Sequence, residues 1–149
     1  MKLDEYRFPL FIDLNGKRAV IIGGGNIALR RAHILQSFGA QVTMIAPECK
    51  EIPDGVQFMQ RPYHSGDLSG AFLAVAATND RAVNRQVGQD AVRAGIFVSV
   101  ADRKEESTFY FPAICVGNGL VSGVVSQGEQ HHKTAQAARE IRTVLEDME

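Results

Sequence analysis

The sequence predicts an α/β protein in which a doubly wound parallel sheet is followed by a β-hairpin and a C-terminal helix. Up to Lys104, short apolar runs rich in β-branched residues alternate with helical segments, a pattern typical of parallel βαβ units. After Lys104 this alternation stops, and two strand-like runs are joined by turn residues. A glycine pattern at the first strand-to-helix turn is the third observation.

That glycine pattern lies between an expected strand at residues 17–22 and an expected helix over 26–38. Gly23, Gly25 and Ala28 fit the pattern G-x-G-x-x-A. The first glycine allows a tight turn, the second lets the backbone approach a pyrophosphate, and the small third residue lets the helix pack on the sheet. The helix N-terminus then offers N–H groups and a partial positive charge to phosphates. These features predict a Rossmann-type nucleotide-binding fold, and a glycine-rich turn without a ligand is the alternative.

The second strand is expected at residues 41–46, ending at Ala46 and Pro47. Many NAD sites place an acidic residue at this point to bind the ribose hydroxyls, whereas in this chain Glu48 comes two residues late. No lysine or arginine lies at positions 46–48 to bind a 2′-phosphate. NAD is therefore favoured over NADP, although the sequence alone does not decide between them.

The remaining strands of the sheet are expected at residues 56–60, 72–77 and 96–100, with a helix over 80–94. The run 72–77 is continuously apolar, as expected for a central parallel strand that is covered on both faces. Thr78 and Asn79 follow at its carboxyl end, where ligands bind in open α/β sheets, so both are candidate cofactor contacts. Alternatively, Thr78, Asn79 or Asp80 caps the following helix, and the two roles are compatible.

The residues after Lys104 are expected to form a different kind of structure. Strands over 108–116 and 120–126 are joined by Gly117-Asn118-Gly119, and an amphipathic helix covers 134–149. These elements expose apolar residues that need a cover, and a second copy of the chain is the expected one. The residues concerned are Phe109, Phe111, Ile114 and Val116 in the hairpin and the helical stripe ending at Met148. We therefore expect a nucleotide-binding domain over 1–107, a dimerisation segment over 108–149, and a homodimer.

The beginning of the chain carries an apolar arm over residues 6–14 that ends in the turn Asn15-Gly16. We expect this arm to be a short extended piece that packs on the first strand.

Composition excludes several classes of function. Sixteen basic and seventeen acidic residues give a net charge of −1, which does not suggest a nucleic-acid partner. The longest apolar runs are far too short for a membrane span, and the N-terminus lacks a basic signal region, so a cytoplasmic protein is expected. Cys49 and Cys115 are isolated, lack metal-ligand spacing, and are expected to be reduced thiols.

Taken together, these motifs resemble the precorrin-2 dehydrogenase family, which includes the NAD-binding N-terminal module of siroheme synthases. The resemblance extends from Phe8 to about Leu145. The residues that carry it are Phe8-Pro9-Leu10-Phe11, Gly23-Gly24-Gly25 with Arg31, Ala76-Ala77-Thr78-Asn79-Asp80 with Val83-Asn84, and Val100-Ala101-Asp102 with Phe109, Phe111 and Pro112.

The resemblance implies an enzyme of siroheme biosynthesis that converts the tetrapyrrole precorrin-2 to sirohydrochlorin, with NAD accepting a hydride while a base takes a proton. It also implies that Asp102 is the key catalytic residue. Some members of the family insert iron into sirohydrochlorin at the same site, and this ferrochelatase activity stays open for the present chain. The family usually adds a small helical domain, which this sequence lacks, and residues 126–132 replace a loop that commonly contains Gly-Gly and Ser-Pro.

The candidate site follows from the motifs and the resemblance together. Asp102 is the candidate catalytic base, and its structural alternative is to cap its turn or to pair with Arg103 or Lys104. The candidate cofactor-binding residues are Gly23, Gly24, Gly25, Asn26, Ile27, Ala46, Pro47, Thr78 and Asn79.

Weaker candidates for binding the carboxylates of precorrin-2 are Arg103, Lys104, His131, His132 and Lys133. For the last three, an exposed polar helix start is the alternative. No metal site is expected, because adjacent helical histidines point about 100° apart and are poorly placed to chelate one ion.

Two non-catalytic functions remain as alternatives. One is an NAD-sensing regulatory module, although such modules usually keep an acidic residue where this chain has Ala46 and have no need of Asp102. The other is an assembly subunit with a lapsed site. Consumption of the cofactor in the presence of precorrin-2 distinguishes the enzyme from both.

Overall fold

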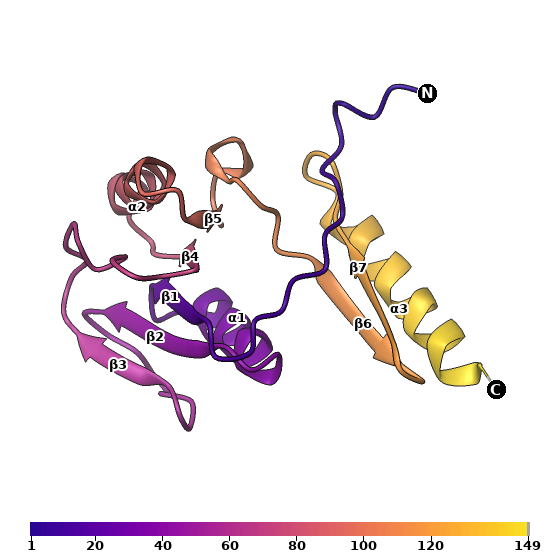
Figure 1. Cartoon of the computed structure of the whole chain (residues 1–149), viewed down its shortest axis with the longest axis horizontal. Helices are drawn as coiled ribbons and strands as arrows, with labels where there is room; N and C mark the ends of the chain where they lie inside the picture. Colours follow the sequence, from indigo (N-terminus) through magenta and orange to yellow (C-terminus); the bar gives the residue numbers. More distant parts are fainter. Residues whose placement is uncertain (149) are drawn as a thin grey trace. The chain divides into compact units, whose positions relative to one another are not determined.

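The computed structural model describes residues 1–148, which fold as two compact units (Figure 1). The larger unit is Ile12–Phe109. The smaller unit combines Met1–Phe11 with the described residues from Tyr110 onwards. None of the described helices is both long enough and apolar enough to cross a lipid bilayer.

The larger unit is built on a five-stranded parallel sheet with the order β3-β2-β1-β4-β5. Its strands are β1 (Arg18–Ile22), β2 (Gln41–Ala46), β3 (Gln57–Gln60), β4 (Leu73–Ala76) and β5 (Phe97–Val100). Because β1 pairs with β2 on one side and with β4 on the other, the strand order reverses at β1. In doubly wound folds, ligands bind at the carboxyl ends of the strands at this switch point.

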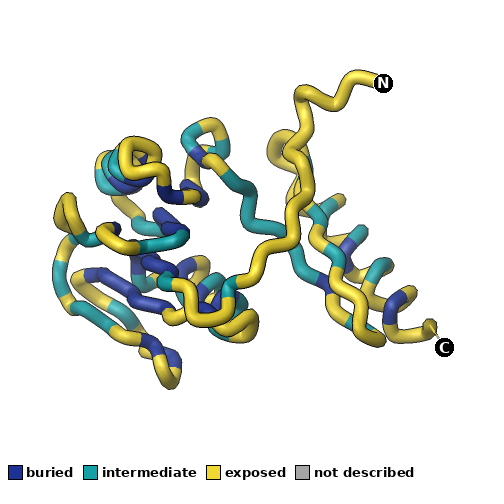
Figure 2. Tube along the Cα trace, in the orientation of Figure 1, coloured by how far each residue is buried: buried dark blue, intermediate teal, exposed yellow. Residues whose placement is uncertain are grey.

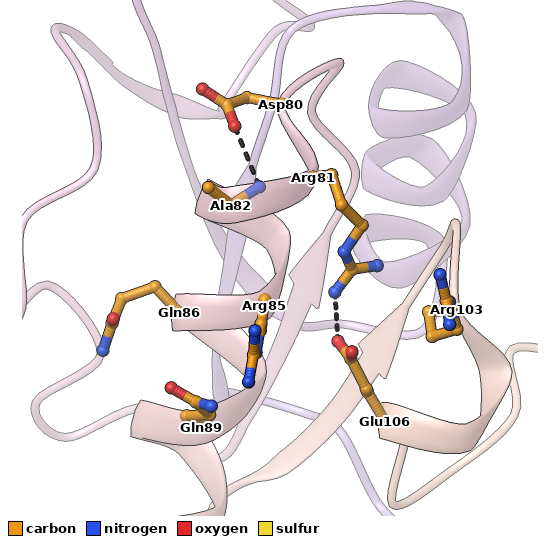
Figure 3. Close-up of a pocket in the computed structure, with 8 residues that line it drawn as sticks. All are labelled: Asp80, Arg81, Ala82, Arg85, Gln86, Gln89, Arg103 and Glu106. Carbon is orange, nitrogen blue, oxygen red and sulfur yellow. Dashed lines mark hydrogen bonds and ion pairs between the residues drawn. The ribbon is translucent and has the colours of Figure 1, made fainter.

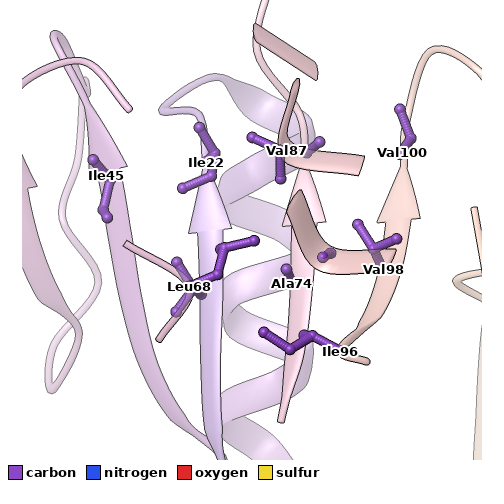
Figure 4. Packing of buried hydrophobic residues seen from close by; sticks show 11 residues of the cluster. Ile22, Ile45, Leu68, Ala74, Val87, Ile96, Val98 and Val100 are labelled. Carbon is purple, nitrogen blue, oxygen red and sulfur yellow. The ribbon is translucent and has the colours of Figure 1, made fainter. Parts of the chain in front are cut away.

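Two helices cover the sheet of the larger unit, α1 (Asn26–Ser37) and α2 (Arg81–Arg93). The α2 side chains Val87 and Ala91 pack in one cluster with residues that alternate along β1, β4 and β5, as Figure 4 shows. The intervening residues of the same strands, such as Ile21 and Val75, are equally buried on the α1 side. Burial on both faces explains why these strands are continuous apolar runs, and Figure 2 shows the strands as the most buried part of the unit.

The ends of the helices follow local sequence signals. Asp80 caps α2, since its Oδ1 accepts hydrogen bonds from the N–H groups of Ala82 and Val83. Gly39 and Gly95 follow α1 and α2 at φ of 85° and 69°, a conformation that favours glycine. The predicted α/β fold class is confirmed, and the elements of the sheet begin and end within about two residues of their expected positions.

The smaller unit contains the antiparallel hairpin of β6 (Ala113–Gly117) and β7 (Leu120–Val124), and the helix α3 (His131–Asp147). Asn118 and Gly119 form the turn with φ of 48° and 77°, and two positive φ angles are typical of a two-residue hairpin turn. The side-chain amide of Asn118 also donates to the carbonyl oxygens of Leu145, at 2.7 Å, and Met148, at 2.8 Å. The hairpin turn therefore holds the last turn of α3.

A small core joins the hairpin to α3. Cys115, Ala138 and Leu145 are buried together, with Ala113 and Ile141 packed against them. The Cys115 thiol donates to the carbonyl oxygen of Ala138 at 3.3 Å, and both Cys115 and Cys49 are free thiols.

The hairpin begins later than predicted, at Ala113 instead of residue 108. The segment after β5 forms a short 3₁₀ helix, η1 (Lys104–Glu106), and then bonds back to β5. The N–H of Val100 donates to Ser107 Oγ at 2.8 Å, and the N–H of Thr108 donates to the carbonyl oxygen of Val98 at 2.8 Å. These bonds hold residues 107–108 beside β5, so they are not available to the hairpin.

The expectation that the N-terminal arm packs on the first strand is wrong. Both edges of β1 are already paired, with β2 and β4, so this strand offers the arm no free edge. Phe8 and Phe11 are 86% and 73% exposed. Arg7 instead places its guanidinium over the ring of Tyr110, at 4.7 Å from the centroid.

Candidate functional site

Three loops at the carboxyl edge of the sheet carry the candidate site, and each is anchored one residue beyond its strand. The N–H of Gly23 donates to Ile45 of β2 at 2.9 Å. The N–H of Ala77 donates to Ile22 of β1 at 2.8 Å, and that of Ala101 donates to Ala76 of β4 at 2.9 Å. The hydrogen-bond ladder of the sheet thus continues for one residue into each loop. It fixes the backbone at the start of the glycine loop and of the loops that carry Thr78 and Asp102.

The three glycines of the first loop have different surroundings. A Cβ atom at Gly23, which has a φ of 134°, would lie 2.2 Å from the carbonyl oxygen of Ala77. At Gly24 it would lie 2.1 Å from the carbonyl oxygen of Glu48. At Gly25 nothing lies within 4 Å of it. The first two glycines therefore allow the loop to press against its neighbours, and Gly25 leaves open space for a ligand.

The first turn of α1 offers backbone donors to that open space. Gly25 is the N-cap in an extended conformation and makes no side-chain cap hydrogen bond, whereas Asp80 caps α2. Asn26 and Ile27 are exposed beside it, and Ala28 is completely buried against the sheet. Uncapped N–H groups at a helix start, combined with the helix dipole, favour an anion such as a pyrophosphate.

The chain after β2 lies next to the glycine loop. Ala46 is the buried last residue of β2, and Pro47 and Glu48 are exposed. The carbonyl of Glu48 is the group that would clash with a side chain at Gly24. The structure therefore brings Ala46, Pro47 and the backbone of Glu48 to the glycine loop, where an adenosine ribose would lie.

Thr78 is part of a hydrogen-bonded lock at the end of β4. Its N–H and hydroxyl both donate to Asn84 Oδ1, at 3.0 and 2.6 Å, and Asn84 Nδ2 donates back to the Thr78 carbonyl oxygen at 3.1 Å. Asn84 is completely buried. The cap predicted for Thr78, Asn79 or Asp80 is made by Asp80, and Asn79 stays exposed at the edge.

Asp102 follows β5 at the same edge, and its side chain is paired with an arginine that the sequence analysis did not single out. Arg81 Nη1 donates to Asp102 Oδ1 at 2.7 Å, and Arg81 Nη2 donates to Glu106. The suggested partners Arg103 and Lys104 are not the ones used. The sequence contains one signal of this pairing. An arginine in the first turn of a helix is unfavourable beside the positive end of the helix dipole, so it suggests a specific acidic partner.

The weaker candidates divide between the two units. Arg103 lines a hollow beside α2, and Lys104 begins η1 close in sequence to Asp102. His131, His132 and Lys133 form the exposed first turn of α3 in the smaller unit. Within residues 1–148, no three His, Cys, Asp or Glu side chains are grouped so that they could hold a metal ion.

Arg31 links the candidate cofactor helix to the strand that leads to Asp102. Its Nη1 donates to Ser99 Oγ on β5 at 3.1 Å. Burial, together with the neighbouring charge of Arg30, lowers the pKa of Arg31 to about 10, so the side chain stays charged at neutral pH.

Comparison with known proteins agrees with this geometry. A family model described as putative NAD(P)-binding matches residues 10–113. A probable multifunctional siroheme biosynthesis protein HemA of Ruminiclostridium josui is 44% identical over 145 residues, which are 93% of this chain and 28% of that protein. A siroheme synthase of Chromobacterium violaceum is 38% identical over 147 residues, 95% of this chain and 30% of the relative. The chain thus spans less than a third of the length of these relatives.

A solved structure of SirC, a precorrin-2 dehydrogenase, has the same fold. The two superpose with a TM-score of 0.77 at 24% sequence identity, over 93% of this chain and 71% of that one. The likeness to precorrin-2 dehydrogenases and siroheme synthases that the sequence predicts is confirmed. The predicted nicotinamide dinucleotide cofactor is confirmed as well. Because the family model matches well over half of its residues, the chain belongs to the putative NAD(P)-binding family.

Proposed function

We propose that the chain is an NAD-dependent dehydrogenase that oxidises precorrin-2 to sirohydrochlorin. The observation that carries this proposal is the placement of three features on one sheet edge: the open Gly25 at the uncapped start of α1, the ordered Thr78 loop after β4, and Asp102 after β5. In this fold class, a dinucleotide with its pyrophosphate at α1 extends along this edge towards β4 and β5. Its relatives in siroheme synthesis support the choice of substrate.

The residues present fit such a cofactor, and each has a definable task. The N–H groups at the start of α1 would bind the pyrophosphate, while the lock between Thr78 and Asn84 keeps the neighbouring loop in place. NAD, when bound in this position, would supply the hydride acceptor. Dehydrogenation removes a hydride and a proton from the substrate, and Asp102 would accept the proton and release it to solvent.

Arg81 holds the carboxylate of Asp102 in position for this task. The guanidinium holds Oδ1, and within residues 1–148 the second oxygen, Oδ2, has no hydrogen-bond partner, so it can face a substrate. The same guanidinium is held by Glu106, which restricts the rotation of the arginine. We assign Asp102 as the base and Arg81 as its positioning residue.

We further propose NAD over NADP and a homodimer. No basic residue follows β2 at positions 46–48 to receive a 2′-phosphate. For the dimer, the smaller unit exposes apolar side chains that a second copy would cover. Of the side chains that the sequence suggested, Val116, Val144 and Met148 are exposed, while Phe109, Phe111 and Ile114 are half-buried. The same segment also exposes Leu120, Val121 and Val125.

The decisive experiment is anaerobic turnover of precorrin-2, followed by the absorbance of NADH. Asp102→Asn keeps the shape of the side chain and removes its basicity, so turnover should fall by about 100-fold or more. NAD affinity, measured by calorimetry, should stay unchanged. Glu105→Gln is the matched control, because Glu105 is an exposed acid three residues away, and it should keep wild-type turnover.

Two outcomes would contradict the proposal. Wild-type protein that binds NAD but never reduces it with precorrin-2 would favour a sensing or assembly module. An Asp102→Asn variant that turns over at the wild-type rate would remove Asp102 as the base, and the dehydrogenase assignment would then need another acceptor for the proton.

A further inference from the structure

A hollow of about 940 Å³ lies along the flank of α2, where it faces the segment that follows β5. The α2 residues Arg81, Arg85 and Gln89 are spaced four apart, so they form one row along the helix. Arg103 and Glu106 form the opposite wall (Figure 3). We call this feature the α2 groove. Its volume is near the upper end of the roughly 300–1,000 Å³ of ordinary ligand pockets, which is more than a single small anion needs.

The walls of the groove are held firmly. Arg81 bridges them through its ion pair with Glu106. Further along the helix, Gly88 lets the two walls approach, since a Cβ atom there would lie 3.2 Å from Val100 Cγ2 and 3.7 Å from the carbonyl oxygen of Glu106. Ser107 fixes the end of the second wall through its hydrogen bond with the N–H of Val100. These contacts hold the two walls in place before a ligand binds.

The charges in the groove fall into two groups. Arg81 is committed to Asp102 and Glu106, and Asp80 is committed to capping α2. Arg85 and Arg103 are both exposed, and within residues 1–148 neither guanidinium has a hydrogen bond or ion pair. The uncommitted charge is thus entirely positive.

The placement of these two arginines limits the kind of anion that suits them. In Figure 3 the Arg81–Glu106 pair lies between Arg85, on α2, and Arg103, on the loop after β5. A single carboxylate or phosphate that bridged Arg85 and Arg103 would have to displace the Arg81–Glu106 ion pair, which would separate two opposite charges. Two carboxylates on one larger molecule can reach the two guanidiniums from either side of it, and guanidinium groups bind carboxylates in a fixed, often bidentate geometry.

We propose that the α2 groove is a subsite that binds two carboxylate side chains of one polycarboxylate ligand through Arg85 and Arg103. The groove adjoins Asp102 through the shared residue Arg81, so a ligand held there would have its body near the candidate base. If the proposed dehydrogenase function holds, the ligand is the tetrapyrrole substrate, and the identity of the ligand rests on that function.

The test uses the whole chain and an octacarboxylate porphyrin as a stable probe, with binding followed by porphyrin fluorescence. Each of Arg85→Gln and Arg103→Gln should raise the Kd of the probe about fivefold, a typical effect of one exposed charge-assisted hydrogen bond, and the double variant about 25-fold. Added salt should weaken wild-type binding more than binding by the double variant. Arg93→Gln is the matched control, because Arg93 lies on the same helix, outside the groove, with its side chain 73% exposed, and it should bind like wild type.

Two further measurements separate this subsite from the proposed activity and from the cofactor. In turnover of precorrin-2, the double variant should raise KM with kcat nearly unchanged, and NAD affinity should not move. A probe Kd within twofold of wild type in the double variant would overturn the subsite. A parallel loss of NAD affinity would also overturn it, since the groove would then serve the cofactor. If the arginines bind the probe but wild-type protein does not oxidise precorrin-2, the subsite stands and the dehydrogenase proposal falls.

Discussion

Replacing Gly25 by Asp should separate cofactor binding from folding more cleanly than any other change in the glycine loop. Gly25 has a φ of −85°, which all residues adopt, and a Cβ atom there meets nothing within 4 Å. Aspartate is also a better N-cap than glycine, so the variant should gain about 0.5 kcal/mol in stability. For a chain of this size, that gain corresponds to a rise of about 1–2 °C in Tm.

The same carboxylate should prevent the pyrophosphate from binding. Two unit charges about 4 Å apart repel by about 4 kcal/mol at an effective dielectric constant near 20, and exposure of the site to solvent reduces this to about 2–3 kcal/mol. Because about 1.4 kcal/mol corresponds to a tenfold change, the Kd for NAD should rise about 100-fold. Isothermal titration calorimetry measures the affinity, and a thermal melt of the protein without cofactor measures the stability.

Two companion variants isolate the causes. Gly25→Asn matches aspartate in size and capping but carries no charge, so it should melt like Gly25→Asp and lose only part of the affinity. Gly23→Ala should lose stability instead, by about 2 kcal/mol or more, because its Cβ would overlap the Ala77 carbonyl at a positive φ. A Gly25→Asp variant that binds NAD within threefold of wild type would show that no pyrophosphate lies at α1.

Three other predictions concern the base, the assembly and acid stability. Arg81→Gln should lower kcat about tenfold at unchanged NAD affinity, and Arg81→Lys should restore part of it, because lysine keeps the charge but loses the two-armed geometry; equal loss in both would contradict a positioning role. The chain should be a dimer by light scattering at micromolar concentration, and Val121→Glu should yield a folded monomer; a monomeric wild type would refute this. Asp67→Asn should cost about 2 kcal/mol at pH 7 in urea unfolding, since Asp67 holds Arg61 with both oxygens at 2.8 and 2.9 Å. The hydrogen bond from Arg61 lowers the pKa of Asp67 below its ordinary 3.8. The stabilisation that ionised Asp67 contributes is therefore complete above pH 3.8 and is lost as the pH falls through the lowered pKa. A difference in unfolding free energy between variant and wild type that is as large at pH 2 as at pH 7 would contradict this origin.

The sequence predicted those features of the fold that depend on local chemistry. Continuous apolar runs identified the buried strands, and Gly39 and Gly95 marked the helix ends because only glycine easily adopts the required φ. The start of the hairpin was misplaced because residues 107–108 form hydrogen bonds with β5, a pairing that has no period of its own in the sequence. The arm was misplaced for a similar reason, since pairing of both edges of β1 is a property of the whole sheet.

The candidate site also has parts that the local sequence predicts and parts that depend on residues far apart in the chain. The glycine loop is recognisable because its chemistry is contained in six consecutive residues. The partner of Asp102 was missed because Arg81 lies 21 residues earlier and reaches it only through the neighbouring strand ends. The α2 groove is likewise assembled from a helix and a distant loop, so the spacing of Arg85 and Arg103 along the chain carries no signal of their shared position.

The hydrogen bonds that extend past the strands have a consequence for the thermodynamics of binding. Gly23, Ala77 and Ala101 each bond to the strand beside them, so the three loops proposed to meet the cofactor are anchored at their first residues before any ligand binds. Ordering a flexible backbone costs roughly 1–2 kcal/mol per residue, and these anchors remove part of that cost before any ligand arrives. Binding should therefore show a small entropy penalty, with association limited by the encounter of the partners and not by rearrangement of the loops.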